Sequence, residues 1–235
     1  MIYYFSGTGN SHYVAEVLSK SLQDTMQSIE SAQSIKQDEI RGIVTPVYFF
    51  GLPDIVKDFL ERLSVSPKSY FYLVVTYGGK PGNIGKEANS IMQKKGTGFY
   101  AMYGVKMVDT YIPMYDASKN EKVESQIDPQ IEEIITTIKE RRIGDYLKGT
   151  VPVLINKACS FQYKQIRKTN NLTIDESCIH CGLCAKECPE QAIEIKDHVT
   201  FRKEQCMMCL RCLHHCPVNA IRFKNKDKGQ YRRLL

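Results

Sequence analysis

Eight of the nine cysteines fall into a repeated motif, and this repeat constrains the fold more than any other feature of the sequence. The first copy begins at Cys178 with the spacing C-x2-C-x2-C-x3-C-P, and the second copy begins at Cys206 with the same spacing. An Ala-Ile pair follows each copy, starting at Ala192 and at Ala220. A duplicated unit of this kind predicts two similar half-modules related by a pseudo-two-fold axis.

The spacing within each copy suits an iron–sulfur cluster. Three cysteines at steps of three let one loop reach three corners of a cubane cluster, whereas the fourth iron lies beyond the reach of that loop. In proteins that hold two such clusters, the fourth cysteine of each motif ligates the other cluster. The predicted ligand sets are Cys178, Cys181, Cys184 and Cys216 for the first cluster, and Cys206, Cys209, Cys212 and Cys188 for the second.

Structural zinc is the alternative for such a cysteine-rich segment. Zinc sites usually present C-x2-C pairs separated by longer spacers, not two tandem triplets that each lead to a fourth Cys and a Pro. Residues 175–224 instead resemble a bacterial two-cluster ferredoxin, which implies two 4Fe–4S clusters in a small α+β fold. The two loops differ where Gly182 corresponds to Leu210. We therefore expect the clusters to differ in hydrogen bonding, and through it in reduction potential.

Cys159 and the histidines near the motifs have no place in this ligand set. Cys159 is either a buried, inert thiol or a redox-active one. Because eight cysteines complete both clusters, His180, His214 and His215 are interpreted as spacers between ligands.

The first 145 residues alternate between strand and helix patterns. Short apolar runs suited to strands lie at 1–5, 43–47, 70–77 and 99–108, and helical periodicity is found at 11–21, 54–63, 83–95 and 127–142. The run Tyr70–Tyr77 is apolar throughout, as expected of a strand covered on both faces. Strands that alternate with helices predict a parallel sheet covered by helices.

A loop of small residues, SGTGNS at 6–11, follows the first predicted strand. Its backbone N–H groups and the N-terminus of the next helix make a site for a phosphate dianion, and its glycines permit close approach. The loop lacks the lysine of a triphosphate-binding loop and the G-x-G-x-x-G of a dinucleotide site. Alone, it could equally be a tight turn and helix cap.

Two further loops follow later strands, at Thr45–Pro53 and Thr76–Asn83. In a doubly wound sheet, the loops at the carboxyl ends of the strands meet at the switch point and bind the ligand. The first loop supplies aromatic side chains for stacking on a flat ring, and the second supplies glycines and backbone groups for a polar ring edge.

Residues 1–145 resemble a flavodoxin, in which SGTGNS corresponds to the FMN-phosphate loop, and the whole chain resembles the flavodoxin–ferredoxin fusion proteins of anaerobes. The resemblance implies an α/β, doubly wound parallel sheet of order 2-1-3-4-5 that binds FMN rather than FAD, followed by the small two-cluster ferredoxin domain. It also implies that Tyr48 stacks on the flavin ring. A flavodoxin fold that has lost its cofactor is the alternative. The expected FMN contacts are Ser6, Gly7, Thr8, Gly9, Asn10, Ser11, Pro46, Val47, Tyr48, Phe49, Phe50, Gly51, Thr76, Tyr77, Gly78, Gly79 and Asn83.

The expected domain boundaries follow from these patterns. Residues 1–145 form the FMN-binding domain, 146–170 form a connector with little pattern, and 171–235 form the ferredoxin domain with a basic C-terminal tail. The tail from Arg222 to Arg233 contributes to a net charge of +6 and either guides an acidic redox partner or is simply solvated.

The sequence also predicts where the protein resides. It has no apolar run long enough to span a bilayer, and its N-terminus lacks the basic leader of a signal peptide. A cytoplasmic location is therefore expected, where cysteines indicate metal or redox chemistry rather than disulfides.

The favoured function is electron transfer from FMN through both clusters to a redox partner protein, with the cofactors supplying the chemistry. The alternative is a flavin-dependent reductase of a small molecule, fed through the clusters. No catalytic residue is assigned, although His12, Tyr77 and Tyr111 stay open as acid–base candidates. A redox sensor that binds nucleic acid would need a DNA-reading motif, which is not found. Neither nucleic acid nor a direct NAD(P)H site is expected.

Overall fold

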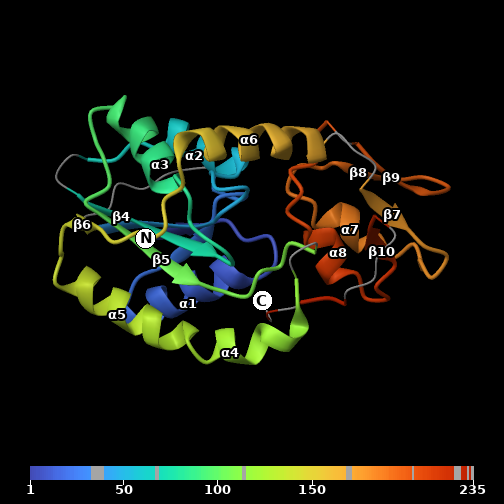
Figure 1. The fold of residues 1–235 in the computed structure, drawn as a ribbon, viewed down its shortest axis with the longest axis horizontal. Helices are drawn as coiled ribbons and strands as arrows, with labels where there is room; N and C mark the ends of the chain where they lie inside the picture. The colour runs from blue at the N-terminus through green and yellow to red at the C-terminus, as the bar shows by residue number, and fades with distance from the viewer. Residues whose placement is uncertain are drawn as a thin grey trace.

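The structure is a computed structural model that describes residues 1–32, 40–66, 69–112, 115–167, 171–202, 204–224, 229–231 and 233. Figure 1 shows a large α/β part built on one sheet and a smaller cysteine-rich part beside it. Helix α6 runs along both parts.

The large part contains a parallel sheet of order β2-β1-β3-β4-β5-β6. The predicted order 2-1-3-4-5 is confirmed, and a short strand extends the sheet beyond β5. The sequence pattern did not locate the edge strands β2 and β6, because segments of three and two residues carry too little pattern. The strands are β1 Ile2–Tyr4, β2 Met26–Ser28, β3 Ile40–Pro46, β4 Tyr70–Tyr77, β5 Ala101–Lys106 and β6 Gly144–Asp145.

Helices cover both faces of the sheet. Helices α2 (Asp54–Arg62) and α3 (Ile84–Gln93) pack on the face that receives Phe71, Leu73 and Val75 of β4. Helices α1 (Asn10–Ser21) and α5 (Ile127–Lys139) pack on the opposite face. Because alternate side chains of β4 enter the two cores, this strand is apolar throughout, as predicted. A 3₁₀ turn, Ala117–Lys119, leads into the short helix α4, Asn120–Glu124.

The segment 146–170, expected to be a connector with little pattern, contains helix α6, Val153–Arg167. Tyr163 is the only buried residue of this helix. The helix therefore lacks the buried apolar stripe that makes an amphipathic helix recognisable in a sequence. The sequence pattern therefore did not predict this helix, which contacts both parts of the molecule.

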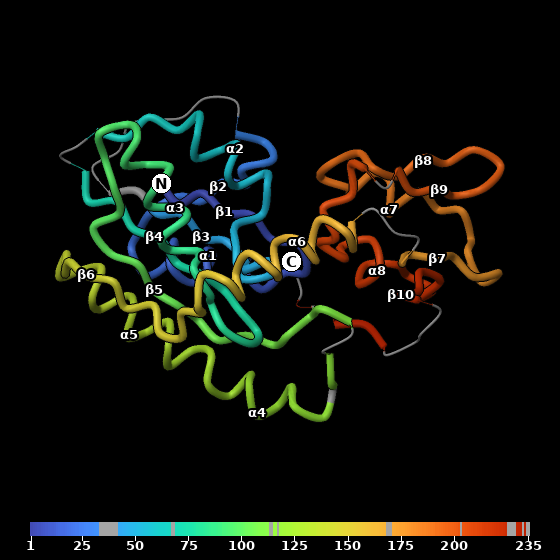
Figure 2. The backbone as a smooth tube through the Cα atoms, turned by 45° about the horizontal axis from the view of Figure 1, so that its top comes forward, coloured from blue at the N-terminus to red at the C-terminus, as the bar shows by residue number. Residues whose placement is uncertain are grey.

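Within its described residues, the cysteine-rich part contains two small sheets and two short helices, which lie beside the large part in Figure 2. Strand β7 (Leu172–Ile174) pairs antiparallel with β10 (Ile221–Phe223), and β8 (Ile193–Ile195) pairs antiparallel with β9 (Val199–Phe201). Helix α7 (Leu183–Lys186) carries Cys184, and α8 (Arg211–His215) carries Cys212. The two helices thus occupy equivalent places in the repeated motif, as expected of a duplicated unit.

Candidate functional site

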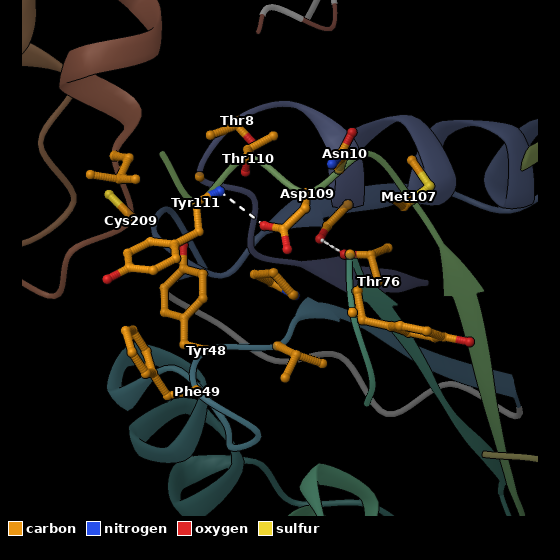
Figure 3. Close-up of a pocket in the computed structure, with 18 of the residues that line it drawn as sticks. Thr8, Asn10, Tyr48, Phe49, Thr76, Met107, Asp109, Thr110, Tyr111 and Cys209 are labelled. Atoms are coloured by element: carbon orange, nitrogen blue, oxygen red, sulfur yellow. Dashed lines mark hydrogen bonds between the residues drawn. The ribbon is translucent and has the colours of Figure 1, made fainter. Parts of the chain in front are cut away.

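A cavity of about 330 Å³ opens at the carboxyl ends of β1, β3, β4 and β5 (Figure 3). Its volume lies in the range of small-molecule sites, about 300–1,000 Å³. The three loops singled out in the sequence meet here. The residues expected to contact FMN that line it are Ser6, Gly7, Thr8, Asn10, Ser11, Pro46, Val47, Tyr48, Phe49, Phe50, Thr76, Tyr77, Gly78 and Gly79.

Three residues expected to contact FMN do not line the cavity. Gly9 precedes α1 with a left-handed φ of 93°, and a Cβ there would lie 2.5 Å from the carbonyl oxygen of Arg233. Gly51 exchanges backbone hydrogen bonds with Tyr48. Asn83 precedes α3, and its side-chain amide donates to a backbone carbonyl 3.0 Å away, in the segment that leads to α6. These residues shape the loops rather than the wall.

The SGTGNS loop is held in place by its own hydroxyl groups. The N–H of Gly9 donates to Ser6 Oγ at 3.1 Å, and Thr8 Oγ1 donates to Thr110 Oγ1 at 3.1 Å. Ser11 Oγ and Thr76 Oγ1 lie 2.8 Å apart. Helix α1 begins next to this loop with no side-chain cap and no acidic residue in its first turn. An N-terminus of this kind suits a phosphate, because its N–H groups and dipole favour an anion.

A fourth loop, Met107–Tyr111, also lines the cavity. Only its Tyr111 was singled out from the sequence, as an acid–base candidate, and the loop itself was missed. It follows β5 directly, so the rule that strand ends gather at one edge would have pointed to it. Asp109 accepts the N–H of Tyr111 at 3.0 Å and packs so closely on Gly78 that a Cβ there would lie 2.3 Å from Asp109 Cβ. Burial raises the pKa of the Asp109 carboxyl, and the Tyr111 hydrogen bond opposes that shift.

Aromatic side chains form the wall that faces the cysteine-rich part. Phe49 stacks on Tyr163 of α6 with ring centroids 4.9 Å apart, and Tyr48 packs edge-on against Phe5 and Tyr163. Burial raises the pKa of Tyr163, whose hydroxyl donates to the carbonyl of Met207 at 2.5 Å. The α6 residue Cys159 is half-buried and lines the same cavity.

The eight motif cysteines gather in two small cavities of about 20 Å³ each. Each cavity takes three cysteines from one motif and the fourth from the other, which is the crossed arrangement expected from the spacing. Among the residues that the structure describes, no three His, Cys, Asp or Glu side chains are placed to hold one metal ion. The first cavity is lined by Cys178, Cys181, Cys184 and Cys216, and the second by Cys206, Cys209, Cys212 and Cys188.

Backbone N–H groups point at the sulfur atoms in both cavities. Cys188 Sγ accepts from the N–H of Ala192 and Cys216 Sγ accepts from that of Ala220, each at 3.2 Å. Burial raises the pKa of Cys209 to about 12. A metal that binds such a thiol lowers its pKa, because the thiolate is the ligand and its charge is then compensated.

The second cysteine cavity abuts the large cavity. Cys209 and Leu210 line both, so these two residues form a shared wall, and Figure 3 shows Cys209 close to Tyr48 and Tyr111. A Cβ on Gly7 would lie 2.8 Å from the carbonyl oxygen of Cys209, so only glycine allows this approach. Neither Cys209 nor Leu210 was expected at the large cavity, because nothing in a sequence tells how two domains pack.

His214, expected to be a spacer, instead links the two parts. It is fully buried, and its Nε2 lies 2.8 Å from the carbonyl oxygen of Thr110. Its Nδ1 accepts the N–H of Tyr231 at 3.1 Å, so the neutral ring carries its proton on Nε2 and donates it to Thr110.

Comparisons with known proteins address each part separately. Residues 177–228 match the family described as the 4Fe-4S dicluster domain. The strand order of the other part is that of flavodoxin. The chain joins a flavodoxin-like sheet to a dicluster domain. No curated protein matches it significantly.

Solved structures that resemble the chain correspond to only part of its length. A flavodoxin of Streptococcus pneumoniae TIGR4 is 15% identical, with 57% of this chain and 97% of that one covered and a TM-score of 0.37. The Trp repressor binding protein of Bacillus subtilis is 17% identical, with 55% and 97% covered and a TM-score of 0.39. Rubredoxin oxygen:oxidoreductase of Desulfovibrio gigas is 14% identical, with 60% and 36% covered and a TM-score of 0.38.

The basic tail is engaged with the rest of the molecule at two of its arginines. Arg222 pairs with Asp175 at 2.9 Å, and Arg233 pairs with Glu124 and lies over the Tyr13 ring. The tail positions 225–228 and 232 lie outside the described residues. None of the helices in the described part combines the length and apolarity needed to cross a bilayer.

Proposed function

We propose that this protein carries electrons between FMN, two 4Fe–4S clusters and a redox partner protein in anaerobic metabolism. The observation that carries the proposal is the wall of Cys209 and Leu210, which separates the large cavity from the second cysteine cavity. Bound FMN accepts two electrons and releases them singly, whereas each cluster carries one, so adjacent sites can exchange electrons.

The fit of FMN rests on the loops around the large cavity. In this proposal the SGTGNS loop and the start of α1 hold the phosphate, and Tyr48 lies against the flavin ring. Asn10 Oδ1 is buried with no hydrogen-bond partner among the described residues, so it is available to accept from a ligand hydroxyl. Its amide nitrogen is already used, donating to Val108 O at 3.0 Å.

The fit of the clusters rests on the crossed cavities. We assign one cluster to Cys206, Cys209, Cys212 and Cys188, beside the flavin, and the other to Cys178, Cys181, Cys184 and Cys216, further away. In this order, the cluster of the first motif is the last carrier of the path and exchanges electrons with the partner protein.

The surface at the first-motif cavity suits a partner that binds briefly. Cys181 is exposed, and the apolar Ile179 and Val218, which line this cavity, are 60% and 37% exposed. A small apolar patch around a redox site permits close approach without a large, slowly dissociating interface. The basic tail remains our candidate for steering an acidic partner, although Arg222 and Arg233 already pair within the chain.

The test is cofactor analysis of protein purified without oxygen. About eight irons and eight sulfides per chain are expected, together with one FMN, and reduced flavin should pass its electrons to the clusters. Stoichiometric zinc with little iron would contradict the proposal. Saturable turnover of a small substrate on an artificial reductant, with no protein partner, would favour the reductase instead.

A further inference from the structure

Arg211 breaks the symmetry of the two cysteine motifs. It stands between Cys209 and Cys212, where the first motif has Leu183. Its side chain is only 13% exposed. A buried guanidinium is costly unless it is paired and fully hydrogen-bonded, so its presence at this position needs an explanation.

The guanidinium of Arg211 contacts three separate segments. Nη2 donates to the carbonyl of Ser6, in the proposed phosphate loop, at 2.6 Å. Nη2 and Nη1 donate to the two carboxylate oxygens of Glu30 at 2.6 and 2.8 Å. Nη1 also donates to the carbonyl of Glu187 at 2.9 Å, directly before Cys188. One side chain therefore ties the phosphate loop to both segments that supply the second cysteine cavity.

Glu30 offsets the cost of burying this cation. Both carboxylate oxygens of Glu30 accept from the guanidinium, so the buried positive charge has an anionic partner. The side chain of Glu30 is 26% exposed and follows β2 in the large part, so the ion pair crosses the boundary between the two parts.

We propose that Arg211, paired with Glu30, is a positioning residue that holds the second-motif cluster against the FMN phosphate loop for electron transfer between them. The inference rests on the proposed function. Arginine suits four acceptor oxygens on three residues, because its donors form a rigid fork, whereas lysine offers a point charge.

The two charges of the pair must act on the cluster in opposite directions. A cation near a cluster stabilises the added electron, and an anion opposes it, more strongly in a buried site than in water. Removing the Arg211 charge should therefore lower the reduction potential of the second-motif cluster, and removing the Glu30 charge should raise it.

The experiment uses the full chain, loaded with FMN and both clusters. Reduction potentials are measured by redox titration followed by electron paramagnetic resonance, and flavin-to-cluster transfer is measured by rapid kinetics. Arg211→Leu, which copies the first motif, and Glu30→Gln each remove one charge. Arg211→Lys keeps the charge and loses the fork. Arg222→Leu is the matched control, because it breaks the Arg222–Asp175 pair within the cysteine-rich part.

We expect Arg211→Leu and Arg211→Lys to slow the transfer about tenfold. Arg211→Leu should lower the second-motif potential, Glu30→Gln should raise it, and Arg211→Lys should leave it close to wild type. The control should change neither the transfer rate nor this potential. A purely structural pair would give shifts of one sign, or none, in the two charge-removing variants.

Shifts of the same sign, or a transfer rate in Arg211→Lys within about twofold of wild type, would overturn the inference. If Arg211→Leu fails to load its cofactors, the reduction potential of Glu30→Gln and the transfer rate of Arg211→Lys still test the inference. Failure of the wild-type chain to bind FMN or iron would be a failure of the proposed function itself, which the cofactor analysis detects separately.

Discussion

The two cysteine motifs share one spacing but lie in different surroundings. Around the first motif Ile179 and Cys181 are exposed, whereas around the second Leu210 and Leu213 are 3% and 2% exposed. The second motif contributes a wall to the large cavity, and the first does not. The comparison teaches that the repeat predicts the same kind of ligand set in each half, while in our proposal the residues between the cysteines place each half in the electron path.

Leu210 shows the conformational cost of placing the second half-module against the large cavity. Both Gly182 and Leu210 adopt a left-handed backbone, with φ of 80° and 60°. Glycine does so freely, but leucine gives up about 1 kcal/mol. Leu210 offsets this cost by packing in the apolar cluster between the two parts, whereas Gly182 has no side chain to bury and no residue of the helix that follows it, α7, is buried.

The largest expected effect comes from removing the crossing ligands. Cys188→Ser should destroy the cluster of the second motif and cut transfer from the flavin, lowering iron from about eight to about four per chain. Cys216→Ser should destroy the other cluster and leave flavin-to-cluster transfer intact. Iron analysis with electron paramagnetic resonance distinguishes the two. If each serine damaged the cluster of its own triplet, crossed ligation would be wrong.

The next effect concerns the flavin, which in this account lies against the second cysteine half-module and not against the first. Thr8→Ala should weaken FMN binding about tenfold or more, because a hydrogen bond to a charged acceptor contributes about 1.5–3 kcal/mol. Titration by flavin fluorescence measures it. Riboflavin, which lacks the phosphate, should bind weakly to both proteins and serves as the control. Equal affinity of the wild-type chain for riboflavin and FMN would refute the phosphate loop.

Exchanging the residues at the left-handed positions sharpens the comparison further. Leu210→Gly removes a buried side chain at a cost of about 2–5 kcal/mol, of which relief of the backbone returns about 1. Gly182→Leu should cost only about 1 kcal/mol. Denaturant unfolding of the loaded proteins compares the two variants. Equal losses of stability would mean that Leu210 does not hold the second half-module against the sheet.

The smallest effect is one of pH, and its sign differs between the two regions. Burial raises the pKa of Asp109, so the folded protein loses stability as pH rises through that pKa. Hydrogen bonds from Ser177 lower the pKa of Asp175, near the first motif, so stability is lost there as pH falls. At neutral pH Asp109→Asn should therefore raise the melting temperature of the cofactor-free chain, and Asp175→Asn should lower it. Shifts in the same direction would contradict these assignments.

The sequence predicted what depends on local pattern. The strand order was implied by the flavodoxin resemblance. The crossed cysteine sets rest on the spacing and on the ligation found in two-cluster proteins, and they agree with the cysteines that line each small cavity. The loop Met107–Tyr111 was within reach of the same strand-end rule. Helix α6 was not, because only Tyr163 of that helix is buried. Arg211 could not be distinguished from a surface cation in the sequence. The residues that it contacts, Ser6 and Glu30, are about 200 residues away and come near only when the two parts pack.

The most direct test of the central claim is anomalous diffraction at the iron edge from crystals of the loaded protein grown without oxygen. The account predicts one four-iron centre bound by Cys206, Cys209, Cys212 and Cys188, and a second bound by Cys178, Cys181, Cys184 and Cys216. Flavin density should lie in the large cavity, nearer to the first of these centres. Flavin beside the centre that contains Cys181, or iron held by four cysteines of a single motif, would contradict it.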